Sequence, residues 1–351
     1  MSATSPSRSN PKKPNVATPA AGVSPRSPED EPTPTGAFRM IAWRKSPPKW
    51  HRAAEVAMKF IALSAIVAVA LIFVFIAVES IPLFTSHVVH QEVTLAKMWL
   101  RQAWDGPGFA WQPTSTVPKF SILPLLVGSL KITVVSVAVG APLGILAAIF
   151  TSQIAPRWLR EILKPTIELL AGIPSVVIGV FALLVMATWF QRAFHFEHRL
   201  NALVAGCALS LTIIPLVFTL AEDALSSVPK SFADASLALG ASRMYTITYV
   251  IVPAALPGIA AGVVLGFGRA IGETMIVVMA SGNAALLNWS LGTSTRTITA
   301  TIAQEMAEVV HGSPHYVVLF VLGATLLMFA FATNLVAQRI VERFRRKRGG
   351  T

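Results

Sequence analysis

Six long apolar stretches constrain this chain more than any other feature of its sequence. Each holds about 20 residues with few charges, which is the length that a helix needs to cross the ~30 Å hydrocarbon core of a bilayer. A segment in lipid must satisfy its backbone hydrogen bonds internally, so each stretch is expected to be helical. The sequence therefore predicts an all-α membrane protein with six transmembrane helices, at residues 56–78, 125–150, 166–190, 202–221, 255–280 and 317–337.

Charge and cysteine content agree with this class. The 351 residues are 54% hydrophobic and 13% charged, and the net charge is +12. The basic residues gather beside the apolar stretches without interleaved stacking aromatics, so they indicate membrane topology and not nucleic-acid binding. The single cysteine, Cys207, can form no internal disulfide and is expected to pack as a small hydrophobe.

The distribution of Lys and Arg predicts the orientation. With the amino terminus in the cytoplasm, 21 Lys and Arg lie on the inner side of the membrane and six on the outer side. Cytoplasmic loops carry the excess of positive charge in membrane proteins. We therefore expect a multi-pass protein of the cytoplasmic (inner) membrane with both termini in the cytoplasm.

The chain divides into a leader, a first transmembrane helix, an outer region, a five-helix core and a basic tail. The leader is rich in Ser, Pro, Lys and Arg and poor in large apolar residues, so it is expected to be a disordered cytoplasmic segment. The outer region is expected to form short helices and loops whose tryptophans, including Trp111, anchor at lipid headgroups. The boundaries are 1–50, 51–80, 81–124, 125–338 and 339–351, and the long inner loop of the core is 222–254.

The fifth apolar stretch carries two opposite charges near the middle of the bilayer, Arg269 and Glu273. Such charges usually face a bundle interior or a watery path. Three interpretations arise: a structural ion pair, an element of a substrate path, or a voltage sensor, which would carry several arginines. Arg preceding Glu by four residues is the less favourable order for helix support, which favours the substrate path over the structural pair.

Glycines recur at four-residue spacing along the same stretch. A helix advances ~100° per residue, so one series falls within a stripe roughly 80° wide that also carries Arg269 and Glu273. Small residues at this spacing let another helix approach closely. The predicted packing residues are Gly258, Gly262 and Gly266, together with Gly268 and Gly272.

The inner loop before this stretch contains a predicted short helix. Pro229 suits a helix start and Gly240 fits the left-handed position just past a helix end, so residues 230–239 are expected to make about three turns. Phe232, Leu237 and Leu239 give this helix an apolar face in water. It is either a connector that packs on its own bundle or a helix that docks in a partner's groove.

Motifs for catalysis are missing from the sequence. It contains no G-x-x-x-x-G-K-[ST] loop for ATP and no recognisable nucleophile–base arrangement. Six histidines fall in predicted outer loops, but no carboxylate or cysteine cluster completes a zinc site around them. We therefore expect a chain that is not an enzyme and that holds no metal and no cofactor.

The inner loop resembles the EAA–G–I–LP signature of importer-type ABC permeases. Asp stands for Glu, Ser for the second Ala, and Val for both Ile and Leu, while the spacing of Gly and Pro is kept. The residues that carry the resemblance are Asp234-Ala235-Ser236, Gly240, Val250 and Val252-Pro253.

Longer stretches resemble the phosphate-specific ABC transporter permease family. They are LKPTIELLAGIPSVVIG, SLALGASRMYTITYVIVPAALPGI, GFGRAIGETMIVVMASGN and RTITATIAQEMAE. The last two, with the long outer loop before the second span, are more similar to the PstC-type subunit than to the paired PstA-type subunit. The resemblance covers residues 121–337 and implies a type I ABC importer permease (MetI-like) fold.

This resemblance also implies a mechanism and partners. The implied complex joins this chain to a PstA-type permease subunit, two PstB-type ATPase subunits and a PstS-type phosphate-binding protein, and it imports inorganic phosphate by ATP-driven alternating access. Arg269 would present positive charge to phosphate, while Glu273 would hold Arg269 in place and limit how tightly phosphate binds. The residues implied in ATPase coupling are Asp234, Ala235, Ser236, Gly240 and Pro253.

Rival functions remain at this point. A permease of the same fold could carry molybdate, sulfate or phosphonate, because one arginine does not distinguish these oxyanions. An ion-coupled secondary transporter would show an inverted repeat and discontinuous helices at mid-membrane, and the sequence shows neither. A membrane scaffold or sensor without transport would leave the inner-loop helix unexplained.

Overall fold

The computed structural model describes residues 49–101 and 108–346, so the predicted leader lies outside the described residues except for its last two positions. The chain forms two units, Met1–Ala65 and Ile66–Thr351. The described part of the first unit is the beginning of helix α1 (Lys49–Ser80), whose apolar side chains are exposed. A helix that is apolar all round is typical of a membrane span.

The described part of the chain contains six helices long and apolar enough to cross a membrane, which confirms the predicted number. The third begins later than predicted, and the fifth ends earlier. The six candidate spans are Ala53–Thr85, Leu123–Ile154, Ser175–Phe194, Ala202–Ser226, Arg243–Gly272 and Pro314–Val336.

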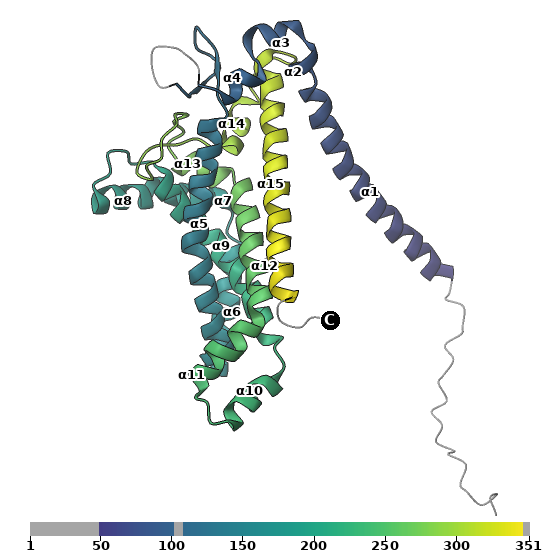
Figure 1. Cartoon of the computed structure of the whole chain (residues 1–351), viewed down its shortest axis with the longest axis vertical. Coiled ribbons are helices and arrows are strands. Elements are labelled where there is room, and N and C mark those ends of the chain that lie inside the picture. Colours follow the sequence, from purple (N-terminus) through teal and green to yellow (C-terminus); the bar gives the residue numbers. More distant parts are fainter. Residues whose placement is uncertain (1–48, 102–107, 347–351) are drawn as a thin grey trace, which may run out of the picture. The chain divides into compact units, whose positions relative to one another are not determined.

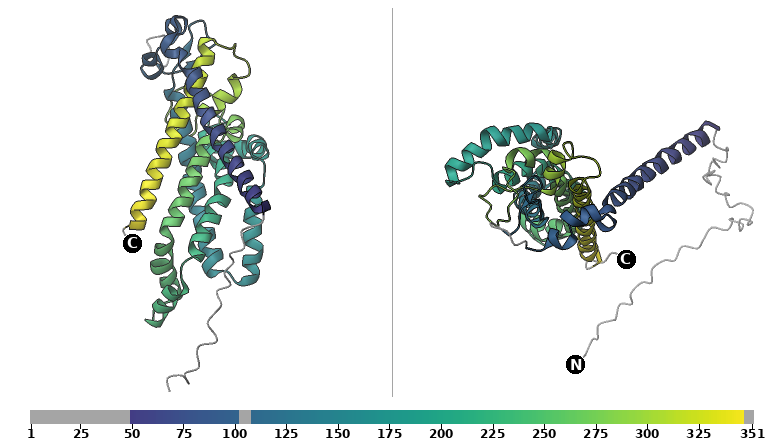
Figure 2. Two further views of the ribbon diagram at one scale, coloured as in Figure 1. Left: turned by 90° about the vertical axis from the view of Figure 1, so that its right-hand side faces the viewer. Right: turned by 90° about the horizontal axis from the view of Figure 1, so that it is seen from above.

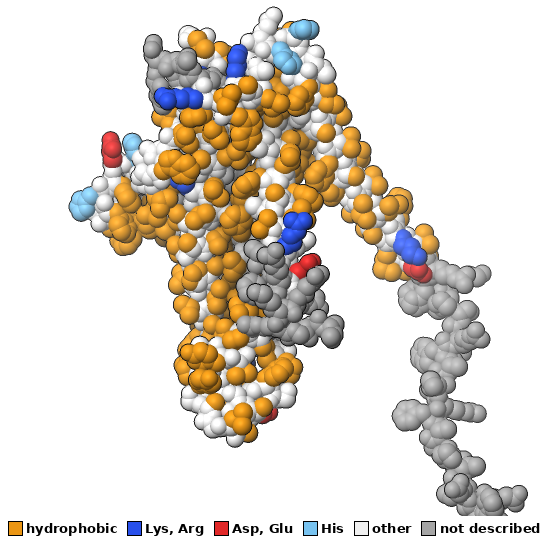
Figure 3. Space-filling view, in the orientation of Figure 1, with side chains coloured by type: hydrophobic (Ala, Val, Ile, Leu, Met, Phe, Trp, Pro, Cys, Tyr) orange, Lys and Arg blue, Asp and Glu red, His pale blue; other side chains and the backbone are white. Residues whose placement is uncertain are grey.

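Four long helices form the centre of the second unit (Figures 1 and 2): α5 (Leu123–Ile149), α9 (Ala202–Ser226), α12 (Val252–Gly272) and α15 (Pro314–Arg346). Helix α9 contacts α5 and α12, and α12 also contacts α5 and α15. Gly140 lets α5 approach α9 closely, because a Cβ there would lie 3.1 Å from the Cβ of Ile213. Apolar side chains cover most of the visible surface of these helices (Figure 3), as a lipid environment requires.

The third predicted span, 166–190, is wrong as a single helix. Helix α6 (Arg157–Ala171) ends before Pro174, whose extended backbone (ψ 136°) caps the next helix. A residue before proline is disfavoured in the helical region, which explains the interruption. The spanning segment follows it as α7 (Ser175–Phe181), η2 (Ala182–Met186) and α8 (Ala187–Phe194).

Two π-helical turns lie at the end of the second unit that carries α10 (Lys230–Ala238). The first, η1 (Phe150–Ile154), extends α5, and the second, η3 (Ile247–Ile251), joins α11 (Arg243–Thr246) to α12. Pro253 lies in the first turn of α12 and has no N–H to donate, and the wider turn of η3 comes directly before this helix.

Short elements gather at the opposite end of the second unit. They are α2 (Pro82–Thr85), α3 (His87–Glu92), α4 (Leu95–Trp99), the antiparallel strands β1 (Trp111–Gln112) and β2 (Lys119–Phe120), and α14 (Ile298–Glu305). They share a core with the first turns of α15. Trp111 is 2% exposed within this core, so its predicted role as a headgroup anchor is wrong.

Candidate functional site

The fifth apolar stretch is broken, and the prediction of one helix over residues 255–280 is wrong. Helix α12 ends at Gly272, Glu273 is extended (φ −69°, ψ 133°), and α13 (Met275–Ala280) begins two residues later. The Oγ1 hydroxyl of Thr299 donates a 3.0 Å hydrogen bond to the Glu273 carbonyl. A hydroxyl from a segment remote in sequence therefore satisfies a carbonyl that the break releases.

Arg269 lies in the last turn of α12 and is exposed. No ion pair joins it to Glu273, and it has no hydrogen-bond partner within residues 49–101 and 108–346, so Glu273 does not hold it in place as the resemblance implied. It lines a groove of about 660 Å³ between α12 and α15, whose other lining residues are mostly apolar but include Thr333 and Asn334. A guanidinium in an apolar span is costly to leave against lipid, so this position calls for water, protein or an anion.

The glycines of α12 divide into two groups. Gly258, Gly262 and Gly266 face α9: a Cβ at Gly262 would lie 3.1 Å from the Leu220 Cβ, and one at Gly258 would overlap the Ala224 Cβ. A Cβ at Gly268 or Gly272 would meet nothing within 4 Å, so the packing predicted for these two residues is absent from the described chain.

Matched glycine substitutions test this division. Gly258→Ala is expected to destabilise the protein by about 1–3 kcal/mol, because the new methyl group overfills the contact with α9. Gly268→Ala is expected to leave stability unchanged or to raise it by up to ~1 kcal/mol, since alanine is the better helix former. Thermal unfolding in detergent measures both variants. Equal unfolding temperatures would contradict the packing described here.

Helix α10 has no buried residue, and Asp234 and Ala235 are exposed. Pro229 precedes the helix, and Gly240 follows it at φ 84°, where any other residue would be strained. The amide of Gly240 donates to the Leu237 carbonyl (2.9 Å), which closes the last turn. Leu239 is 89% exposed. A helix with its apolar side chains in water is typical of a docking element more than of a packed connector.

Two contacts that the sequence did not predict connect α10 to α11, and α11 to η1. The hydroxyls of Ser236 and Thr246 lie 2.9 Å apart, and Thr246 is buried. Arg243 donates from Nη2 to the Gln153 carbonyl (2.7 Å) at the end of η1. The helical path then continues through η3, past the half-buried Pro253, into α12. A displacement of α10 would therefore act directly on the helix that carries Arg269.

An ion pair with a buried carboxylate joins α6 to α9 near the same end. Lys164 Nζ lies 2.7 Å from Glu222 Oε2, and the side chains are 37% and 7% exposed, respectively. The hydrogen bond to Glu222 raises the pKa of Lys164, and this effect exceeds the opposing effect of desolvation. The carboxylate of Glu222 is thus compensated although it is almost out of contact with water. Within the described residues, no group of three or more His, Cys, Asp or Glu could hold a metal ion.

Comparisons with known proteins agree with this architecture. Residues 140–347 match the family described as "Binding-protein-dependent transport system inner membrane component". The chain is 40% identical over 234 residues to "Probable ABC transporter permease protein YqgH" of Bacillus subtilis, which covers 66% of this chain and 75% of that protein. It is 32% identical over 259 residues to "Phosphate transport system permease protein PstC" of Mesorhizobium japonicum, with 68% and 78% covered.

A solved structure is similar in fold. It is a chain of a bacterial ABC transporter involved in the import of the acidic polysaccharide alginate, with a TM-score of 0.50 and 15% sequence identity over 83% of this chain and 99% of that chain. The predicted MetI-like permease fold is confirmed by this similarity together with the family match. The matched residues include α9, α10, α12 and α15. This chain therefore belongs to the inner-membrane components of binding-protein-dependent transport systems, the membrane-spanning permease subunits of ABC importers.

Proposed function

We propose that this chain forms half of the translocation path of an ATP-driven importer of inorganic phosphate, which works by alternating access. The observation that carries the proposal is Arg269, an exposed guanidinium without a partner in the described chain, at the end of the helix that α10 can move. The name of the Mesorhizobium japonicum relative supports phosphate as the substrate.

The chemistry of Arg269 suits a phosphate dianion. A guanidinium presents N–H groups in a planar fork that matches two phosphate oxygens. Two unit charges 4 Å apart attract by ~1 kcal/mol in water and by ~4 kcal/mol at an effective dielectric constant of 20. One arginine in a partly dehydrated path can therefore draw phosphate in without trapping it. The Glu273 carboxylate, four residues on, would repel a bound dianion and so favour its release.

Three surfaces of the chain are assigned to the three kinds of partner subunit. We assign the exposed α10, with Asp234, Ala235, Ser236 and Gly240, to contact with one of two PstB-type ATPase subunits, and Pro253 to the start of the helix that α10 moves. A PstA-type subunit would complete the path beside Arg269, and a PstS-type protein would deliver phosphate at the opposite end. This assignment places α10, the leader 1–50 and the tail 339–351 in the cytoplasm, with 125–338 as the permease core.

Uptake by the reconstituted complex tests the substrate. Proteoliposomes that contain the four components enclose ATP on the side of the ATPase subunits. Labelled phosphate is added on the side of the binding protein, and arsenate, sulfate and molybdate are added there as competitors. We expect ATP-dependent phosphate accumulation that arsenate inhibits and that sulfate and molybdate leave unchanged. Accumulation of sulfate or molybdate in place of phosphate would assign the chain to another oxyanion.

A further inference from the structure

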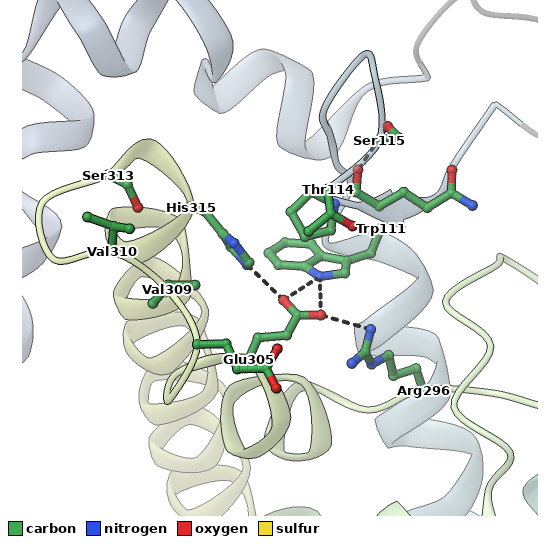
Figure 4. Close-up of a pocket in the computed structure, with 12 residues that line it drawn as sticks. Trp111, Thr114, Ser115, Arg296, Glu305, Val309, Val310, Ser313 and His315 are labelled. Atoms are coloured by element: carbon green, nitrogen blue, oxygen red, sulfur yellow. Dashed lines mark hydrogen bonds and ion pairs between the residues drawn. The ribbon is translucent and has the colours of Figure 1, made fainter.

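The carboxylate of Glu305 contacts Trp111, 194 positions away, and two residues on either side of α14, Arg296 and His315 (Figure 4). The indole N–H of Trp111 donates to both carboxylate oxygens, at 3.0 and 3.1 Å. Arg296 Nη1 lies 2.8 Å from Oε1, and His315 Nε2 lies 2.8 Å from Oε2. One acidic side chain at the end of α14 thus holds strand β1, the segment before α14 and the first turn of α15.

This network is largely shielded from water. The side chains of Arg296, Glu305 and His315 are 16%, 15% and 19% exposed. Arg296 also donates from Nη2 to Gln304 Oε1 (2.6 Å), so it holds two consecutive residues of α14. Charge-assisted hydrogen bonds in such surroundings are stronger than those of surface pairs. The β1–β2 hairpin is therefore fixed firmly to the last turn of α14.

The first turn of α14 is fixed at the helix break beside Arg269. Thr299 donates to the Glu273 carbonyl, and the Ile298 amide donates to the Ser129 hydroxyl of α5 (3.2 Å). All residues of this turn, Ile298–Thr301, are buried. Because α14 has only eight residues, it is ~12 Å long and too short to bend appreciably. The hairpin and the helix break thus lie at the two ends of one rigid element.

We propose that Glu305 is a positioning residue for transport, which makes α14 a rod between the β1–β2 hairpin and the α12–α13 break. A pocket of about 870 Å³ opens beside the network, between hairpin residues 112–115 and residues 308–313. A protein that displaces the hairpin from this pocket would pull Trp111 from Glu305, shift α14 and loosen the Glu273 carbonyl. The inference rests on the proposed function in one respect: it treats the α12–α13 break as part of the translocation path.

Hydrogen exchange of the assembled complex tests the rod without measuring transport. Glu305→Gln keeps the shape of the side chain but removes the charge that Arg296 and Trp111 bind. We expect exchange to rise about 10-fold both in the hairpin (residues 108–120) and at the break (residues 270–276), because the contacts at both ends of α14 weaken together.

Two further variants test the contacts at the two ends of α14 separately. Trp111→Phe is expected to speed exchange mainly in the hairpin, and Thr299→Val mainly at the break. In a Thr299→Val background, Glu305→Gln should add little at the break, because the connection is already lost. A change confined to the hairpin in Glu305→Gln would overturn the proposal. If Glu305→Gln fails to assemble, Glu305→Asp supplies the same comparison, and an unchanged break in that variant would overturn it equally.

The kinetics of phosphate uptake distinguish a positioning role of Glu305 from a purely structural one. We expect Glu305→Gln to lower the maximal rate of phosphate uptake about 10-fold with an unchanged KM for phosphate, because the residue touches no substrate. A raised KM with an unchanged maximal rate would contradict a positioning role. If the wild-type complex carries no phosphate, the proposed function fails. The hydrogen-exchange result still shows whether α14 couples the hairpin to the helix break.

Discussion

Replacing Arg269 with Gln is expected to reduce ATP-dependent phosphate uptake by at least ~100-fold, because a bidentate charge-assisted contact of about 1.5–3 kcal/mol per hydrogen bond is lost. The complex should still assemble, since Arg269 is exposed and has no partner in the described chain whose charge would be left uncompensated. Uptake is measured in proteoliposomes, and assembly by size-exclusion chromatography of the purified complex.

Two control variants sharpen this result. Arg269→Lys keeps the charge but loses the planar fork, so it should retain part of the uptake. Arg192→Gln removes another exposed arginine, from the last turn of α8, and should leave uptake unchanged. Normal uptake in Arg269→Gln would remove this residue from the mechanism.

The second large effect is expected at the exposed end of α10. Leu239 is 89% exposed, and burial of a leucine side chain in a partner's groove contributes ~1.5–3 kcal/mol. Leu239→Ser should therefore weaken ATPase binding by roughly 10–100-fold and reduce uptake at a limiting ATPase concentration. Co-purification of the ATPase with the variant complex measures the first effect directly.

An exposed leucine in another loop serves as the control. Leu291 is 40% exposed in the loop between α13 and α14, away from α10 in the sequence, so Leu291→Ser should leave ATPase binding intact. Wild-type ATPase binding in Leu239→Ser would show that α10 is a connector and not a docking helix.

The spans and α10 could be predicted because their signals are local. A run of apolar residues as long as the bilayer is thick specifies a helix wherever it packs. Likewise, Pro229 before α10 and Gly240 after it restrict the backbone within a few residues, and the observed φ of Gly240 is 84°.

The break after α12 and the Glu305 network could not be predicted, because distant residues create them. The apolar residues resume at Met275, so the composition does not mark a helix end at Gly272. Thr299, 26 positions after Glu273, satisfies the released carbonyl. Trp111 and Glu305 are 194 positions apart, and no local pattern pairs them. Glu273 does not continue the predicted stripe for the same reason: it lies just past the end of α12, whereas the prediction assumed an unbroken helix.

Charge restoration at position 269 tests the central claim most directly. Arg269→Cys is made in a Cys207→Ala background, which removes the single native cysteine, and the new thiol is modified with small reagents of opposite charge. If an anion passes this position, a positively charged adduct restores ATP-dependent phosphate uptake, a negatively charged adduct does not, and phosphate slows the modification. Wild-type uptake in the unmodified variant, or equal uptake with both adducts, would contradict the account.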